Sequence, residues 1–100
     1  MSTARSRVAI VTGAGRGIGA ATASRLSHDG LAVAALDRDG DAAEETARTI
    51  EKAGGTVLAV TADISSSAQV NEAVDRVVAG LGAPTVLVNN AGISRDSPFE

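Results

Sequence analysis

The stretch that decides the fold reads Thr12-Gly13-Ala14-Gly15-Arg16-Gly17-Ile18-Gly19, and it joins an apolar segment to one with helical periodicity. The segment before it, Val8 to Thr12, is continuous and β-branched, which is typical of a strand buried on both faces. The segment after it, Gly17 to about Asp29, has small and apolar residues at helical spacing and is followed by Gly30, a usual helix terminator. The glycines therefore predict a tight turn from a buried strand into a helix.

The same alternation of strand and helix continues along the chain. Three further strands are predicted, at Ala32 to Asp37, Val57 to Ala62 and Val86 to Val88. Between them, one helix is predicted at Asp41 to Ala53. A second helix is predicted to begin after Ser66, which forms a capping box with Gln69, and its apolar face ends at Gly82. Strands separated by helices of about ten or more residues form parallel βαβ units with right-handed crossovers. The sequence therefore predicts an α/β domain with a parallel sheet, whose last apolar strand has nothing after it to cover it.

Composition excludes several classes of function. The net charge is −3, no cluster of Lys and Arg occurs, and the single aromatic residue is Phe99. Nucleic acid is therefore not expected as a partner, because it is bound through basic clusters and stacked aromatic rings. The chain has no cysteine, its acids and His28 lack metal-ligand spacing, and no apolar run reaches the ~20 residues of a membrane helix. We expect a cytoplasmic protein with no metal and no membrane partner.

The glycine turn has the properties of a phosphate site. Glycines let the backbone approach a ligand closely, and the first amides of the following helix lack partners and lie at its positive pole. A tight turn without a ligand is the alternative. Asp37 argues against it, because this acid ends the second strand at about the ~20-residue offset at which a carboxylate meets the adenosine ribose. Gly15, Gly17 and Ala20 also satisfy the general dinucleotide fingerprint G-x-G-x-x-A, so a diphosphate is expected here on either spacing.

Two motifs at matching positions in the fold resemble those of short-chain dehydrogenases/reductases. The first is Thr-Gly-x-x-x-Gly-x-Gly, carried by Thr12, Gly13, Gly17 and Gly19, and the second is Asn-Asn-Ala-Gly at 89–92. Asp63 and Ile64, after the third strand, match the family's adenine-contacting position. Arg16 stands where the extended branch of the family has glycine, so the resemblance is to the single-domain branch with a Rossmann-type doubly wound sheet.

The resemblance implies a nucleotide site and assigns its residues. The expected cofactor-binding residues are Gly13, Gly15, Arg16, Gly17, Ile18, Gly19, Asp37, Arg38, Asp63, Ile64, Asn90, Ala91 and Gly92. Asn90, Ala91 and Gly92 would border the nicotinamide-side ribose, whereas Asn89 is expected to tie neighbouring strands together. For Asp37 and Asp63 the alternatives are a solvated acid and a turn residue, respectively.

Asp37 also bears on the choice of cofactor. Its carboxylate can accept hydrogen bonds from both ribose hydroxyls of NAD, whereas the 2′-phosphate of NADP would be repelled by on the order of 4 kcal/mol per pair of unit charges at about 4 Å. NAD is therefore the expected cofactor. Arg16 and Arg38 work in the opposite direction, because either guanidinium could bind the phosphate.

Catalysis in the family requires a tyrosine, a lysine four residues later and a serine that positions the substrate oxygen. The chain contains no tyrosine, and these residues normally follow well after Asn-Asn-Ala-Gly. We therefore expect residues 1–100 to be the N-terminal NAD(P)-binding part of one Rossmann-fold domain, with no catalytic residue in this part. The rival interpretation is a redox sensor that binds the dinucleotide without catalysis. A P-loop phosphate-binding domain is disfavoured because no Lys-Ser/Thr follows the glycines.

The substrate class is indicated only weakly. The resemblance implies hydride transfer between nicotinamide and a carbonyl or secondary alcohol. The stretch Ile93-Ser94-Arg95-Asp96 resembles one common in 3-oxoacyl-[acyl-carrier-protein] reductases and suggests a 3-oxoacyl thioester. Those reductases mostly use NADPH, so Asp37 leaves room for an NAD-dependent secondary-alcohol or 3-hydroxyacyl dehydrogenase. A homo-oligomer, dimer or tetramer, is implied by the resemblance alone.

Overall fold

Strands and helices alternate without exception in residues 7–90, the part of the chain that the computed structural model describes. The elements are β1 (Val8–Thr12), α1 (Gly17–His28), β2 (Ala32–Asp37), α2 (Gly40–Lys52), β3 (Val57–Thr61), α3 (Ser67–Gly80) and β4 (Val86–Asn89). The predicted α/β class is confirmed.

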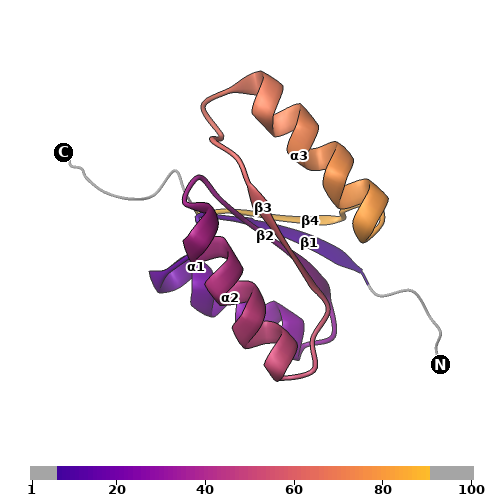
Figure 1. Ribbon diagram of the computed structural model, residues 1–100. Coiled ribbons are helices and arrows are strands. Elements are labelled where there is room, and N and C mark those ends of the chain that lie inside the picture. Colours follow the sequence, from indigo (N-terminus) through magenta and orange to yellow (C-terminus); the bar gives the residue numbers. More distant parts are fainter. Residues whose placement is uncertain (1–6, 91–100) are drawn as a thin grey trace.

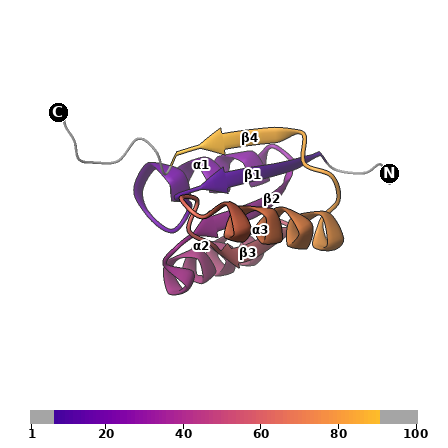
Figure 2. The same cartoon turned by 90° about the horizontal axis from the view of Figure 1, so that it is seen from above.

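The four strands form one parallel sheet in the order β3-β2-β1-β4. β1 is the pivot of this sheet, since Ile10 lies opposite Ala34 of β2 on one side and Leu87 of β4 on the other. The chain first adds strands on one side of β1, then crosses over to add β4 on the other side (Figure 2). In open α/β sheets, ligands bind at the carboxyl ends of strands where the order reverses in this way. The glycine turn follows β1 and therefore lies at this point.

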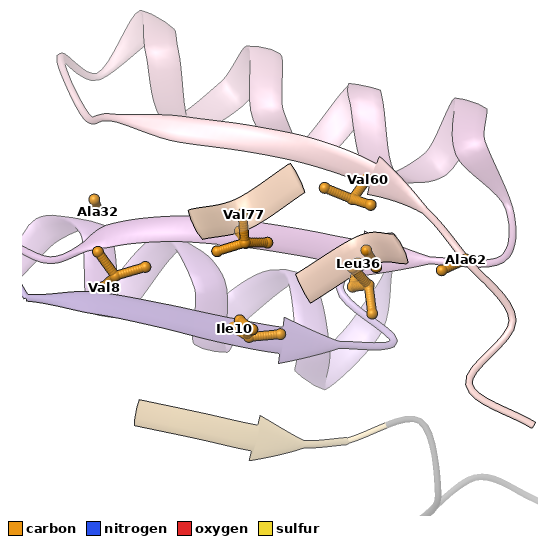
Figure 3. Packing of buried hydrophobic residues seen from close by; sticks show 9 residues of the cluster. Val8, Ile10, Ala32, Leu36, Val60, Ala62 and Val77 are labelled. Carbon is orange, nitrogen blue, oxygen red and sulfur yellow. The ribbon is translucent and has the colours of Figure 1, made fainter. Parts of the chain in front are cut away.

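Helices cover both faces of the sheet, as a doubly wound fold requires. α1 and α2 pack on one face and α3 on the other (Figure 1). Successive side chains of β1 alternate between the two sides: Val8 and Ile10 join the α3 side, and Val11 joins the α1/α2 side. On the α3 side, the fully buried Val77 packs over the sheet among residues that include Leu36 and Val60 (Figure 3).

β4 forms an edge of the sheet and is incompletely covered. Its residues alternate between half-buried and exposed, and the side chain of Leu87 is 67% exposed. Beside it, an apolar groove of about 520 Å³ runs between α3 and the β1 and β4 strands, with Ile10, Val74 and Val86 in its walls. Among the described residues 7–90, the last apolar strand is therefore only partly covered.

β1 and β2 have the predicted bounds, and the ends of the other elements differ from the predicted ones by at most two residues. α2 begins at Gly40 rather than Asp41, because the Asp39 side chain accepts a 3.2 Å hydrogen bond from the Ala42 amide and caps the helix. α1 ends at His28 and α3 at Gly80, where Asp29 and Leu81 are the C-caps. β3 is one residue shorter than predicted and β4 one residue longer.

The capping box before α3 is only half formed. The Ser66 hydroxyl accepts from the Gln69 amide at 3.3 Å, as predicted. The Gln69 side chain does not return to the Ser66 amide, because that amide already donates to the Asp63 carbonyl at 3.0 Å. Gln69 instead accepts from the Asp63 amide at 2.8 Å and so fixes the loop between β3 and α3.

Across residues 7–90, the helices are all too short or too polar to cross a membrane.

Candidate dinucleotide-binding site

The turn between β1 and α1 depends on its glycines for two different reasons. Gly13 and Gly17 have φ angles of 64° and 60°, a region in which a side chain would be strained. Gly19 is required by close packing, since a Cβ there would lie 1.9 Å from the Gly13 carbonyl oxygen. The turn therefore folds back on the first turn of the helix.

The start of α1 presents unsatisfied backbone donors. The N-cap residue, Arg16, has extended backbone and makes no side-chain capping bond. No residue in the 7–90 range accepts a hydrogen bond from the amides of Gly17, Ile18 or Gly19, as expected at the first positions of a helix. A Cβ at Gly17 would meet nothing within 4 Å, so the space beside these amides is open. The dipole of α1 adds partial positive charge, and the arrangement suits an anion such as phosphate.

Two contacts anchor the turn to the rest of the domain. The Ala14 amide donates to the Leu36 carbonyl at 3.0 Å. The hydroxyl of Thr46, a buried residue of α2, donates to the Ala14 carbonyl at 2.8 Å. The conformation of the turn is thus fixed by β2 and α2 before any ligand arrives.

Asp37 lies at the end of β2 and is bonded directly to the turn. Its Oδ2 accepts from the Gly15 amide at 2.8 Å and its Oδ1 from the Asp39 amide at 3.0 Å. A Cβ at Gly15 would lie 2.7 Å from the same carboxylate, so glycine is needed here as well. A carboxylate has about four acceptor positions, so two remain for ribose hydroxyls.

Arg16 and Arg38 have exposed side chains beside the glycine turn and the end of β2, and we call this part of the site the rim. The Arg16 guanidinium forms an ion pair with Asp39, with 2.6 Å between Nη2 and Oδ2. The pKa of Asp39 is lowered, first by the hydrogen bond from the Ala42 amide and then by the hydrogen bond and charge of Arg16. Arg38 is exposed and forms no salt bridge with any residue in the described range. The rim thus carries one paired and one unpaired guanidinium.

Asp63 and Ile64 lie just beyond the carboxyl end of β3, the strand next to β2 in the sheet. The Oδ1 of Asp63 accepts from both the amide and the hydroxyl of Ser65, at 2.9 and 2.7 Å. These two bonds lower the pKa of Asp63, and the charge of Arg38 lowers it further. Asp63 therefore acts as a turn residue through one oxygen, while Ile64, 39% exposed, offers an apolar surface.

One pocket joins these elements. It has a volume of about 490 Å³ and is lined by Gly13, Arg16, Leu36, Asp37, Arg38, Ala62, Asp63, Ile64, Ser65 and Asn90. Most of the residues named from the sequence therefore meet at the carboxyl edge of the sheet. Gly15, Gly17, Ile18 and Gly19 belong to the adjoining turn rather than to the pocket wall, and Ala91 and Gly92 lie outside the described residues.

The two asparagines at the carboxyl end of β4 make different contacts. The Oδ1 of Asn89 accepts from the Thr12 hydroxyl at 3.0 Å, so Asn89 ties β4 to β1, which confirms its predicted role. Asn90 lines the pocket and lies against the helix start, since a Cβ at Gly19 would be 2.8 Å from its Nδ2. Asn90 is thus well placed to border a ligand bound at the glycine turn.

Two important residues were missed by the sequence analysis. Asp39 pairs with Arg16 and caps α2, and Thr46 supports the turn from behind. An acid immediately before a helical segment is a capping signal, so Asp39 could have been found. Thr46 offered no such signal, because only packing shows that its hydroxyl meets the Ala14 carbonyl.

His28 and the acids do not form a second site. His28 is exposed at the C-terminal end of α1, opposite the end that carries the glycine turn. Residues 7–90 contain no group of three His, Cys, Asp or Glu side chains that could hold a metal ion.

A parallel doubly wound sheet with a glycine turn at its switch point, an open helix start and an acid at the end of β2 defines a Rossmann-type domain. The sequence model of the short chain dehydrogenase family matches residues 7–100. The chain belongs to this family.

Two curated relatives illustrate its range. The chain is 40% identical to the short-chain dehydrogenase/reductase homolog YusS of Bacillus subtilis over 95 residues, which cover 94% of the chain and 87% of YusS. It is 50% identical to 2-(R)-hydroxypropyl-CoM dehydrogenase of Xanthobacter autotrophicus over 93 residues, 92% of the chain but 37% of that protein. Unlike YusS, several other curated relatives are much longer, and the chain spans little more than a third of their length.

Solved structures of similar fold include complexes with both nicotinamide cofactors. A 7α-hydroxysteroid dehydrogenase complexed with NADH and 7-oxo glycochenodeoxycholic acid matches with a TM-score of 0.82 and 34% identity, over 85% of the chain and 33% of that structure. A variant of actinorhodin polyketide ketoreductase with NADPH matches with a TM-score of 0.82 and 38% identity, over the same shares. Structures of this fold thus include a complex with NADH and one with NADPH, and the fold alone does not choose between the two cofactors.

Proposed function

We propose that this chain forms the cofactor-binding part of an NAD(P)-dependent oxidoreductase that acts on a carbonyl or secondary alcohol. The observation that carries the proposal is that Asp37 and Asn90 line one pocket and that the open start of α1 adjoins it. Relatives of the chain bear the names of dehydrogenases and reductases, which supports the same reaction class.

The residues present fit a dinucleotide. The amides of residues 17–19 and the open space at Gly17 would receive the diphosphate. Asp37 would accept from the adenosine ribose, Asp63 and Ile64 would border the adenine, and Asn90 the second ribose, with Ala91 and Gly92 beyond it. A bound nicotinamide supplies the hydride acceptor or donor, while the chain's own residues bind and orient it.

We favour NAD over NADP. Asp37 lies in the pocket wall, where its negative charge opposes a 2′-phosphate. Arg16, one of the two guanidiniums that could bind that phosphate, is held in an ion pair with Asp39. The charge arrangement of the rim thus supports NAD.

Residues 1–100 would form the N-terminal part of a single Rossmann-fold domain, with the catalytic half outside it. Three observations support this division: the partial exposure of β4 within residues 7–90, the apolar groove beside it, and the share of about a third that the chain covers in many relatives. In the described residues 7–90, no side chain takes the part of the family's catalytic tyrosine, since the chain has none.

For the substrate, we propose two alternative classes. A 3-oxoacyl thioester is supported by residues 93–96, which lie outside the described residues, and an NAD-dependent secondary-alcohol substrate is supported by Asp37. A homo-oligomer and a cytoplasmic location remain expectations from the resemblance and the composition.

A dinucleotide-binding redox sensor is the second candidate. It is supported by the chain's own residues, which form the elements of a dinucleotide site and include no tyrosine. The two functions make different predictions for turnover but the same prediction for binding.

Fluorescence titration of the full-length protein with NADH and NADPH tests both points. Saturable NADH binding that is tighter than NADPH binding supports the proposal. Turnover of NADH with a panel of ketones and 3-oxoacyl thioesters then separates the enzyme from the sensor. Absence of binding for both cofactors would refute the dinucleotide site altogether.

A further inference from the structure

We propose that Asp39 helps to set the choice between NAD and NADP by holding the Arg16 guanidinium, which would otherwise be free to bind a 2′-phosphate. This inference rests on the proposed dinucleotide site. Asp39 is not among the residues that line the pocket, whereas Arg16 is. Asp39 is thus a positioning residue that acts through Arg16.

The geometry makes Asp39 the fixed member of the pair. Its Oδ1 caps α2 by accepting from the Ala42 amide at 3.2 Å, and its own amide donates to Asp37 at 3.0 Å. Its Oδ2 remains for the Arg16 Nη2, at 2.6 Å. The Arg16 side chain is 73% exposed, so little besides Asp39 restricts it.

These contacts close a ring between the glycine turn and the loop after β2. Gly15 donates to Asp37, Asp37 accepts from the amide of Asp39, and Asp39 pairs with Arg16, the neighbour of Gly15. The position of the Arg16 guanidinium is therefore linked to the carboxylate that would read the ribose.

The charges around the pocket favour a ligand without an extra phosphate. Three carboxylates, Asp37, Asp39 and Asp63, stand against two guanidiniums, Arg16 and Arg38, which leaves one net negative charge. Neutralising Asp39 would balance the count and release Arg16, which is suited to bidentate phosphate binding.

Asp39→Asn separates this role from helix capping. Asparagine caps helices about as well as aspartate but cannot form the ion pair. Asp41→Asn is the matched control, because it removes the same charge two residues further on, in the first turn of α2, and Asp41 forms no ion pair with Arg16.

The test is the ratio of NADPH to NADH dissociation constants, measured by fluorescence titration of the full-length protein. Because an exposed ion pair has only a modest effect, Asp39→Asn should shift the ratio toward NADPH by about fivefold. Asp41→Asn should leave it nearly unchanged. In an Arg16→Gln background, Asp39→Asn should have no further effect on the ratio.

Three results would overturn the inference: an unchanged ratio in Asp39→Asn, an equal shift in Asp41→Asn, or a shift that persists without Arg16. If the parent binds NADH and one of these results occurs, only the role of Asp39 fails. If the parent binds neither cofactor, the proposed function fails with it. Asp39→Ser, which also caps helices, replaces the asparagine variant if that variant does not fold.

Discussion

The carboxylate of Asp37 and the backbone amide of Gly15 are joined by a hydrogen bond of 2.8 Å. This bond connects the end of β2 to the glycine turn that follows β1. The residue that is expected to read the ribose therefore also holds the loop that is expected to receive the diphosphate. A change at Asp37 should alter both the choice of cofactor and the stability of the turn.

Asp37→Ser should shift cofactor preference toward NADPH by about tenfold or more, because a full negative charge beside the 2′ position is removed. It should also lower the free energy of unfolding by about 1 to 2 kcal/mol, since two backbone amides lose their acceptor. Titration with both cofactors and urea unfolding measure the two effects. Preference that stays with NADH at its original ratio would show that Asp37 does not face the ribose.

Gly19→Ala should damage the site through packing. The new Cβ would overlap the Gly13 carbonyl oxygen, so the turn must move away from the helix start. We expect a loss of about 1 to 3 kcal/mol in unfolding free energy and at least about tenfold weaker NADH binding. Ala21→Ser, on an exposed position of α1, is the control and should change neither quantity. Normal NADH affinity in Gly19→Ala would contradict the proposed diphosphate site.

Thr46→Val should destabilise the domain by about 1 to 3 kcal/mol, because the buried Ala14 carbonyl loses its hydrogen bond from the Thr46 hydroxyl. NADH binding should weaken as the turn loosens. Thr49→Val provides the matched comparison, since the Thr49 hydroxyl bonds the Glu45 carbonyl on the exposed side of the same helix. The control should stay within about 0.5 kcal/mol of the parent in urea unfolding. Equal effects of the two substitutions would argue against a supporting role for Thr46.

Acid should destabilise the domain partly through Asp39 and Asp63. Folding lowers the pKa of both carboxyl groups, so their contribution is present above the unfolded pKa of about 4 and is lost as pH falls through the lower folded value. Urea unfolding between pH 7 and pH 3 should therefore show a smaller acid loss in Asp39→Asn and Asp63→Asn than in the parent. Glu72→Gln, an exposed position of α3, serves as the control. A loss as large in Asp39→Asn and Asp63→Asn as in the parent would contradict this assignment.

The helix after β2 could be predicted from the sequence, but the contacts of the loop before it could not. The end of β2 and the presence of α2 were predicted, because apolar strands and amphipathic helices have a local periodicity. The ion pair between Arg16 and Asp39 was not, since the two residues are 23 positions apart and meet only through the turn geometry. The altered capping box is similar: Gln69 bonds the Asp63 amide because the Ser66 amide is already satisfied within the loop.

The sequence by itself determined the alternation of strands and helices, the glycine turn, and the acid at the end of the second strand. These features depend on neighbouring residues, because sterics, periodicity and helix capping act over short range. Only the tertiary structure decided that β4 lies beside β1, which brings Asn90 to the glycine turn and Asp63 to the same pocket as Asp37. Strand order depends on pairing between distant segments, and no local pattern specifies which of several similar apolar strands becomes the neighbour of another.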